Sequence, residues 1–309
     1  MNCIISHVAD LDGAFPIILG SLIFKDLETY SLELDEVEAV LRKILEEKDK
    51  YEKIYITDLN ISEEMAEFIN QDVVFKDKVM VFDHHISNLF LNRFSFIQVV
   101  DSLNGRKECG TTLFYQYLKK NFASPLLEKP CVQWLIELVR ENDTFDFKPS
   151  FKEEAFKLGN LYSIYGREDF ISQFLKRIKE NESFTFSEVE SILLKVEQER
   201  TERYIKEKLS TMQKCIIHGI KVGICFAESH RSLLGHEMCR DESIDVAVII
   251  NVNRSVSYRA NKEEVDVNDL ALIYEGGGHK HAGGSPLPKD LLKIISEAIF
   301  GNIEWMREE

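Results

Sequence analysis

The sequence predicts an α/β protein: a parallel sheet forms an N-terminal domain, and a long helix joins it to a smaller α/β domain. Two patterns support this fold class. In the first half, apolar strand-like runs alternate with amphipathic helical runs, which is typical of a parallel sheet covered by helices. Strand-like runs return in the last third, after a charged segment without Pro or Gly. With 309 residues, 44% of them hydrophobic, the chain can bury a core in each domain.

Three apolar runs predict the strands of the first sheet, and helical patterns lie around and between them. The strands are predicted at Cys3–Ser6, Lys53–Thr57 and Lys78–Phe82, and the helices at Gly13–Phe24, Leu34–Glu47 and Ser62–Asn70. Because strands and helices alternate, the sheet should be parallel and should carry helices on both faces.

After Asp101 the pattern becomes helical and then returns to strands. Residues 187–212 predict one long charged helix, either a solvated surface helix or the connector between two domains. We therefore expect domains at residues 1–186 and 214–309, joined by a helix at 187–213. The other predicted elements are helices at Thr111–Leu118 and Val132–Glu141, and strands at Ile216–Ile217, Lys221–Phe226, Val246–Val252 and Val256–Arg259.

The net charge of −15 narrows the class of partner. A protein that follows long duplex nucleic acid needs a basic face, so we do not expect such a partner, whereas a short phosphorylated ligand can be bound by a few local cations. The six cysteines form no CxxC pair and predict reduced thiols in a cytoplasmic protein. We expect no signal peptide and no membrane span.

Polar residues follow the predicted strands at the point where each strand ends. His7, Asp10 and Asp12 come after the first strand, and Asp58 after the second. Because ligands bind at the carboxyl ends of parallel strands, we expect these side chains to meet at one edge of the sheet. Taken alone, Asp10 and Asp12 fit ordinary turn and helix-capping residues better than metal ligands.

The tripeptide Asp83-His84-His85 follows the third predicted strand. Burying one such polar group without a partner costs roughly 2 to 7 kcal/mol, so these side chains need partners, and a metal site supplies them. The alternative is a solvated loop that contains two incidental histidines. Asp143 follows a predicted helix and is the weakest candidate, since an Asp at a helix end needs no further function.

This donor set predicts a site for two cations. Carboxylates and imidazoles without thiolates suit Mn²⁺, Mg²⁺, Fe or Co. Two cations roughly 3.5 to 4 Å apart can bind an attacking water and the oxygens of a phosphoryl group, and a carboxylate must bridge them.

A second candidate site lies near the C-terminus. Residues 276–284 read GGGHKHAGG, and five glycines in this segment could turn backbone N–H groups toward an anion. The segment is neither a P-loop nor a Rossmann fingerprint, and a flexible surface loop is the alternative. Upstream, Ser257 and Arg259 should lie on one face of a strand, where the guanidinium could hold a phosphate.

With these residues together, the chain resembles the DHH–DHHA1 phosphoesterase superfamily over nearly its whole length. Five motifs occur in order and carry the resemblance, and within the superfamily the chain is most similar to the bacterial nanoRNase (oligoribonuclease) branch. The motifs are His7-x-x-Asp10-x-Asp12-Gly13, Asp58, Asp83-His84-His85, Asp143, and Gly276–Gly284 with its accompanying strand Ser257-Tyr258-Arg259.

The resemblance implies roles for these residues and a cofactor. One ion, expected to be Mn²⁺ with Mg²⁺ or Co²⁺ as alternatives, would bind His7, Asp10 and Asp58, and a second would bind Asp12, Asp58, His84 and Asp143. Two residues would be catalytic. Asp83 would orient the histidine pair, and His85 would either lie behind the metal ligands or touch the scissile phosphate. Ser257, Arg259, Gly276, Gly277, Gly278 and His279 would bind the substrate, with the active site in the cleft between domains.

The implied activity is the hydrolysis of RNA of two to five nucleotides, including linear dinucleotides, to nucleoside monophosphates. A cyclic dinucleotide phosphodiesterase and a phosphatase for 3′-phosphoadenosine 5′-phosphate are the alternatives within the same chemistry. A nucleotide sensor with an inactive site is an alternative from another class. An exonuclease for long strands is disfavoured by the charge, and a homodimer is left open.

Overall fold

The computed structural model describes residues 1–47, 49–146, 152–252 and 255–301. The chain forms two compact units, Met1–Leu194 and Lys195–Glu309. All six cysteines are free; five are buried and Cys215 is exposed. Within the described ranges, no helix combines the length and the apolar character that crossing a membrane requires.

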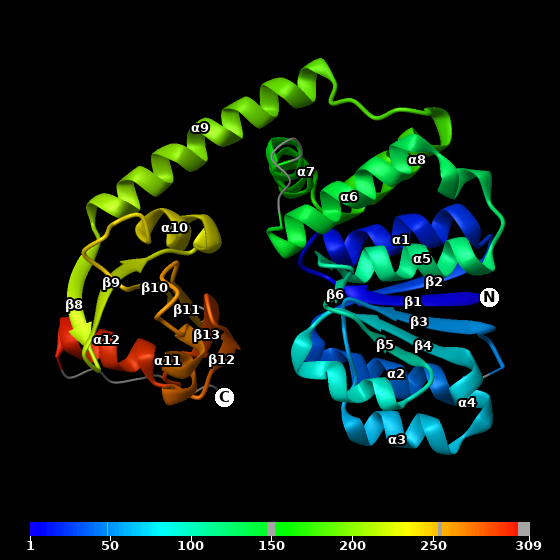
Figure 1. Cartoon of the computed structure of the whole chain (residues 1–309), viewed down its shortest axis with the longest axis horizontal. Coiled ribbons are helices and arrows are strands. Elements are labelled where there is room, and N and C mark those ends of the chain that lie inside the picture. The colour runs from blue at the N-terminus through cyan, green and yellow to red at the C-terminus, as the bar shows by residue number, and fades with distance from the viewer. Residues whose placement is uncertain (48, 147–151, 253–254, 302–309) are drawn as a thin grey trace. The chain divides into compact units, whose positions relative to one another are not determined.

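The first unit contains a five-stranded parallel sheet, which confirms that part of the predicted fold class (Figure 1). The strand order is β2-β1-β3-β4-β5, so the three predicted strands are the central ones. The two edge strands were not predicted, because β2 has no fully buried side chain and β5 is very short. The strands are β1 (Asn2–His7), β2 (Leu27–Leu32), β3 (Lys53–Thr57), β4 (Val79–Asp83) and β5 (Ile97–Val99).

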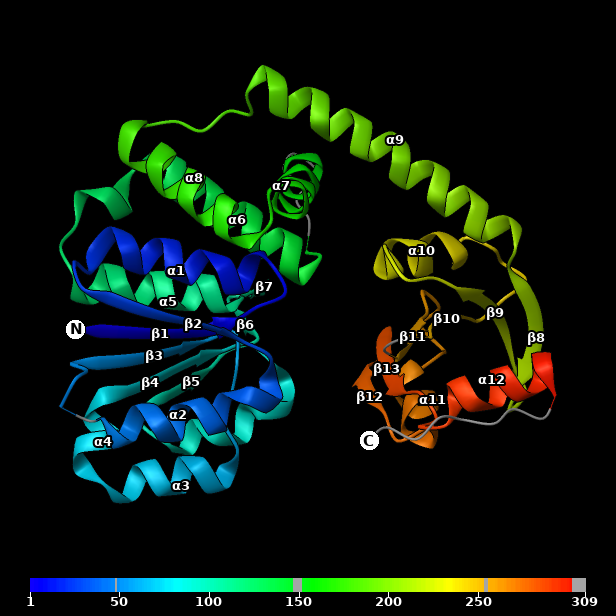
Figure 2. The same cartoon turned by 180° about the vertical axis from the view of Figure 1, so that it is seen from behind.

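Alternating side chains of the central strands enter two separate cores. Ile4 and Tyr55 pack in the layer that contains α1 (Leu11–Ile23) and α5 (Gly110–Asn121). Ile5 and its neighbours pack on the opposite face, against α2 (Val37–Glu46) and α3 (Glu63–Gln71). Figure 2 shows these helices on opposite sides of the sheet, as the period of two in a strand requires.

Further helices pack on the side of the sheet that α1 covers. They are α6 (Pro130–Thr144), α7 (Lys152–Tyr165) and α8 (Arg167–Glu180), while α4 (Val73–Lys78) precedes β4. Helix α8 packs on α1 through edge-to-face aromatic contacts, with the ring centroid of Phe15 lying 6.1 Å from Phe170 and 6.4 Å from Phe174. The short elements are the 3₁₀ helices η1 (Leu34–Glu36), η2 (Ile86–Arg93) and η3 (Pro125–Glu128), and the paired strands β6 (Ser102–Leu103) and β7 (Arg106–Lys107).

The long charged segment is one helix, α9 (Glu188–Ser210), and the boundary between the two units falls inside it. A reciprocal pair of hydrogen bonds starts the helix: Ser187 N donates to Glu190 Oε2 at 2.6 Å, and Glu190 N donates to Ser187 Oγ at 3.2 Å.

The second unit contains a six-stranded mixed sheet with the order β12-β13-β11-β10-β9-β8. Only the pairing of β9 with β10 is parallel. Residues 276–284 were expected to form a nest-like turn, but most of them lie in the antiparallel pair β12–β13 at one edge of this sheet. The elements are β8 (Gln213–Ile217), β9 (Ile220–Phe226), α10 (Arg231–Met238), β10 (Val246–Asn251), β11 (Ser255–Arg259), α11 (Val267–Ile273), β12 (Gly277–His279), β13 (Ala282–Pro286) and α12 (Leu291–Phe300).

Candidate metal centre

Three adjacent strands of the first sheet end in acidic or imidazole side chains. His7 is the last residue of β1, Asp58 follows β3 directly, and Asp83 is the last residue of β4. These strands are neighbours in the order β1-β3-β4. Adjacent strands lie about 4.8 Å apart, so side chains at their carboxyl ends come within reach of one another.

The loop between β1 and α1 brings Asp10 back toward the sheet. Asp10 caps the helix by accepting a hydrogen bond from Gly13 N at 3.0 Å, and its other oxygen lies 3.2 Å from His7 Nδ1. Gly13 is required for this compact loop, because a Cβ at that position would lie 1.9 Å from the carbonyl oxygen of His7. His7 Nδ1 also lies 3.5 Å from Asp58 Oδ2, and these three side chains form one donor group.

Asp12 is fully buried and is held by the N-terminus of α5. Gly110 N and Thr111 N donate to its two carboxylate oxygens at 2.7 and 2.8 Å, as expected for an anion at a helix N-terminus. The Thr111 hydroxyl donates to the carbonyl oxygen of Asp12 at 3.0 Å. That carbonyl has no helical donor because the residue four positions later is Pro16, which lacks an N–H group.

Asp58 has a left-handed backbone conformation, with φ of 56°, which Asp tolerates better than most residues. The backbone of α5 approaches it closely. A Cβ on Gly110 would lie 2.7 Å from Asp58 N, 2.8 Å from Asp58 Cβ and 3.0 Å from Asp12 Oδ2. Glycine at position 110 therefore allows α5 to sit against both carboxylates.

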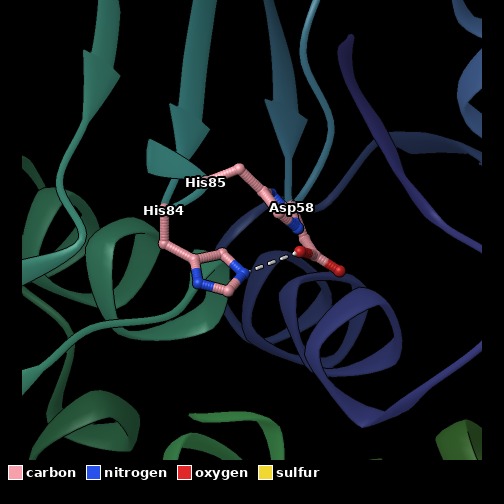
Figure 3. Close-up of side chains that lie close together, drawn as sticks. All are labelled: Asp58, His84 and His85. Carbon is pink, nitrogen blue, oxygen red and sulfur yellow. Dashed lines mark hydrogen bonds and ion pairs between the residues drawn. The ribbon is translucent and has the colours of Figure 1, made fainter. Parts of the chain in front are cut away.

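His84 points into the same cluster (Figure 3). Its Nε2 lies 3.2 Å from Asp58 Oδ1, 3.6 Å from Asp143 Oδ2 and 4.0 Å from Asp12 Oδ2. Asp143, from the last turn of α6, is thus brought to the strand ends. Its Oδ2 is buried and has no hydrogen-bond partner among the described residues.

Asp83 is fully buried and organises the two histidines that follow it. Its Oδ1 lies 2.7 Å from His85 Nδ1 and accepts a hydrogen bond from His84 N at 2.8 Å, while Asn88 Nδ2 donates to Oδ2 at 2.7 Å. The hydrogen bond to Asp83 raises the pKa of His85. Because Nδ1 is bonded to the carboxylate, Nε2 of His85 is left for another partner.

The carboxylates of the cluster carry opposed pKa shifts. Burial, followed by the charge of Asp58, raises the pKa of Asp12 to about 6. Burial and the charge of Asp12 raise the pKa of Asp143 well above its ordinary value. Burial acts in the same direction on Asp58, but hydrogen bonds with His7 and His84 outweigh it and lower that pKa to about 2. These acids crowd one another, and a bound cation would relieve the repulsion.

The donor atoms fit divalent cations. Three groups have one ligand atom per residue within 4.8 Å of the others: His7, Asp10 and Asp58; Asp12, His84 and Asp143; and Asp58, His84 and His85. Two ligands at right angles and about 2.1 Å from an ion lie about 3 Å apart, close to the spacings of this cluster. Asp58 and His84 each belong to two groups, so the groups overlap as neighbouring ions would require.

Some features of the centre were missed in the sequence. Gly110 and Thr111 hold Asp12 through backbone amides, which every helix N-terminus offers and which carry no side-chain signal, and Asn88 holds Asp83 through its side-chain amide. A run of small residues, Gly110-Thr111-Thr112, at the start of a predicted helix is the available hint.

The predicted substrate-binding residues lie in the second unit, where they neighbour one another. Arg259 donates to Ser232 Oγ at 3.0 Å and lies 3.5 Å from the carbonyl oxygen of Gly283. Burial and the charge of Arg231 lower the pKa of Arg259. Ser257 pairs with Gly284 in the β11–β13 ladder. Gly276, Gly277 and Gly278 lie at the start of the β12–β13 hairpin, while the side chain of His279 is outside the described part of the chain.

Known proteins resemble nearly the whole chain, although no family model matches it. The chain is 32% identical over 300 residues to oligoribonuclease NrnB of Bacillus subtilis, an alignment that covers 94% of this chain and 74% of that protein. It is 24% identical to a 3′,5′-cyclic-nucleotide phosphodiesterase of Helicobacter pylori, over 96% of this chain and 98% of that protein.

Two solved structures share the fold. An uncharacterised protein from Helicobacter pylori superposes with a TM-score of 0.51 and 21% identity, over 97% of this chain and 98% of that one. A pGpG-specific phosphodiesterase from Vibrio cholerae, PggH, superposes with a TM-score of 0.51 and 13% identity, over 97% of both chains.

Proposed function

The chain belongs to the NrnB-like branch of the DHH–DHHA1 phosphoesterases, and we propose that it is a metal-dependent phosphodiesterase that hydrolyses very short oligonucleotides. The proposed substrates have about two to five nucleotides and include linear dinucleotides, and the products are nucleoside monophosphates. The family of the chain supports the reaction class, and its free, mostly buried cysteines are in keeping with the proposed place of action, the cytoplasm.

The observation that carries this proposal is the overlap of donor groups around Asp58 at the ends of β1, β3 and β4. Asp143 Oδ2 strengthens it, because a buried carboxylate oxygen without a hydrogen-bond partner is costly unless a cation binds it. If these acids served only the stability of the fold, apolar side chains in their place would make the protein more stable.

Two ions, which we propose to be Mn²⁺ with Mg²⁺ or Co²⁺ as substitutes, would use the donors in two sets. His7, Asp10 and Asp58 would hold one, and Asp12, Asp58, His84 and Asp143 would hold the other. Bound there, divalent ions lower the pKa of a water molecule and neutralise charge on the phosphoryl group.

The chain's own residues prepare the reacting groups. Asp83 accepts the Nδ1 proton of His85, which fixes the ring and leaves Nε2 available to the scissile phosphate or to a departing oxygen. The buried Gly110 and Thr111 amides hold Asp12 in place. In the second unit, Arg259, Ser257, the glycines 276–278 and His279 would bind the phosphate and base at the end of the substrate.

A cyclic-nucleotide phosphodiesterase is the second candidate, because one relative carries that name and spans nearly the whole chain. Hydrolysis of 3′-phosphoadenosine 5′-phosphate is a third substrate within the same chemistry. Both use the same metal centre and differ only in the ligand that the second unit admits.

One experiment tests the proposal and separates these candidates. The full-length protein is incubated with labelled RNA and DNA of two to ten nucleotides, a cyclic dinucleotide and 3′-phosphoadenosine 5′-phosphate, with Mn²⁺ or with EDTA. We expect cleavage of the shortest linear substrates that stops in EDTA and in Asp58→Asn. Cleavage that persists in EDTA contradicts the metal mechanism, and exclusive cleavage of the cyclic substrate contradicts the oligoribonuclease.

A further inference from the structure

We propose that Arg167 is a positioning residue of the metal centre, which holds the loop between β1 and α1 in the shape that lets His7, Asp10 and Asp12 converge. This inference rests on the proposed function only in that it takes the donor cluster to bind cations. Arg167 is the first residue of α8, far from the loop in sequence.

One guanidinium group joins both ends of the loop. Arg167 Nη1 donates to the carbonyl oxygen of Val8 at 3.1 Å, and Nη2 donates to the carbonyl oxygen of Gly13 at 2.9 Å. Nη2 also donates to Ser6 Oγ, in β1, at 3.1 Å. The candidate metal ligands His7, Asp10 and Asp12 all lie between Ser6 and Gly13. The guanidinium therefore holds this segment at both of its ends.

The hydrogen-bond partners of Arg167 indicate that it positions the backbone of the loop. Among the described residues, its hydrogen-bond partners are carbonyl and hydroxyl oxygens, and no carboxylate forms an ion pair with it. Tyr162 OH donates to the same Val8 carbonyl at 3.2 Å. A planar guanidinium can reach two carbonyls at once, whereas an ammonium group has no such fork.

The local sequence does not favour an arginine at this place. A cation in the first turn of a helix opposes the helix dipole, at a cost of about 0.3 to 1 kcal/mol. The next two residues, Glu168 and Asp169, are acidic as that turn prefers. Gly166 precedes the helix with φ of 73°, so the chain turns sharply there and delivers Arg167 to the loop. The hydrogen bonds between Arg167 and the loop offset the cost of placing a cation in the first turn of the helix.

Arg167 acts through the shape of the loop rather than through its charge. After burial, the pKa of Asp12 responds to the charges of Asp58 and His84, and that of Asp58 to its hydrogen bonds with His7 and His84. A shift of the loop would displace His7, Asp10 and Asp12 together, and these residues serve both proposed ions. Outer residues that orient metal ligands typically change metal affinity or activity 10- to 100-fold when they are removed.

The test measures Mn²⁺ binding by the full-length protein, from the electron paramagnetic resonance signal of free Mn²⁺. Wild type, Arg167→Lys and Arg167→Met are compared. The control is Arg93→Met, since the guanidinium of Arg93 pairs with Glu63 and Glu67 at the surface. We expect the Kd for Mn²⁺ to rise about 10- to 100-fold in both Arg167 variants and to stay within about twofold of wild type in the control.

A second measurement distinguishes positioning from stability alone. In Arg167→Ala, added guanidinium ion should restore Mn²⁺ affinity and kcat, while KM for a dinucleotide stays near the wild-type value. Arg167 variants that melt earlier but bind Mn²⁺ as tightly as wild type would overturn the inference. A wild-type protein that binds Mn²⁺ but cleaves no substrate would instead overturn the proposed function. The inference about Arg167 would still stand or fall on the Mn²⁺ binding comparison alone.

Discussion

Asp143 shows how the crowded carboxylates of the candidate metal centre are unfavourable without a cation. Its Oδ2 is buried without a hydrogen-bond partner, and burial together with Asp12 raises its pKa well above the ordinary value. We expect Asp143→Asn to abolish hydrolysis and to stabilise the cation-free protein by about 1 kcal/mol, because it removes one of the crowded charges. Urea unfolding in EDTA measures the stability. A variant that is less stable than wild type in EDTA would show that the carboxylate is not strained.

At Gly110 the backbone of α5 comes close to two candidate ligands, Asp58 and Asp12. We expect Gly110→Ala to lower Mn²⁺ affinity and to destabilise the protein by about 1 to 3 kcal/mol, because the added Cβ collides with Asp58 and Asp12. Gly277→Ala is the control for both measurements, since nothing lies within 4 Å of a Cβ at that position. Equal Mn²⁺ titrations for the two variants would contradict the close approach of α5.

The candidate residues could be predicted from the sequence because each ends an apolar run or lies in a short polar motif. Asp58 and Asp83 needed only the period of a strand and the rule that sites form at carboxyl ends. What could not be predicted is the support behind them. The amides of Gly110 and Thr111 and the guanidinium of Arg167 become partners only through contacts between distant segments, which no local pattern records.

At the scale of elements, the start of α9 is tied to two other helices through Glu190. This buried carboxylate accepts from Ser187 N, from Tyr165 OH of α7 at 2.9 Å and from Arg177 Nη1 of α8 at 2.6 Å. We expect Glu190→Gln to lower the free energy of unfolding by about 2 kcal/mol, because it leaves the buried side of Arg177 without its counter-charge. Glu188→Gln, on the exposed side of the same helix, is the matched control.

The same contact has a pH signature. Burial alone would raise the pKa of Glu190, but hydrogen bonds from Ser187 and Tyr165 and the charge of Arg177 outweigh it and lower the pKa. Since the folded pKa lies below the unfolded one, this stabilisation is present above pH 4.5 and is lost as the pH falls through the folded value. Wild type and Glu190→Gln should therefore converge in stability on acidification, and a constant difference would exclude this ionisation.

The elements that sequence patterns predicted are those with a clear period. The central strands β1, β3 and β4 and the helix α9 correspond to predicted runs, whereas the edge strand β2 is half exposed and alternates weakly. Within the segment 276–284, Gly277–His279 and Ala282–Gly284 pair as strands even though the glycines suggest a turn. The β11–β13 ladder supplies hydrogen bonds along its length, and tertiary pairing of this kind overrides weak strand propensity.

At the scale of the whole molecule, the two units have different proposed functions: the first binds metal ions and the second binds substrate. Arg259 belongs to the second unit, whereas every candidate metal ligand belongs to the first. We expect Arg259→Met to raise KM for a dinucleotide at least tenfold and to leave the Kd for Mn²⁺ unchanged, because a charge-assisted hydrogen bond to phosphate is lost. Calorimetric Mn²⁺ titration and initial rates measure the two effects. A weaker Mn²⁺ affinity in this variant would mean that the units do not act separately.

The single exposed thiol of the chain, Cys215 on β8, offers a practical route to following the enzyme at work. The other five sulfhydryls are shielded by packing, so a maleimide dye should couple once per molecule, as intact mass spectrometry would verify. The label would sit on β8, at the edge of the second sheet opposite the β12–β13 edge. Its anisotropy during nucleotide turnover would then report domain tumbling without any engineered cysteine.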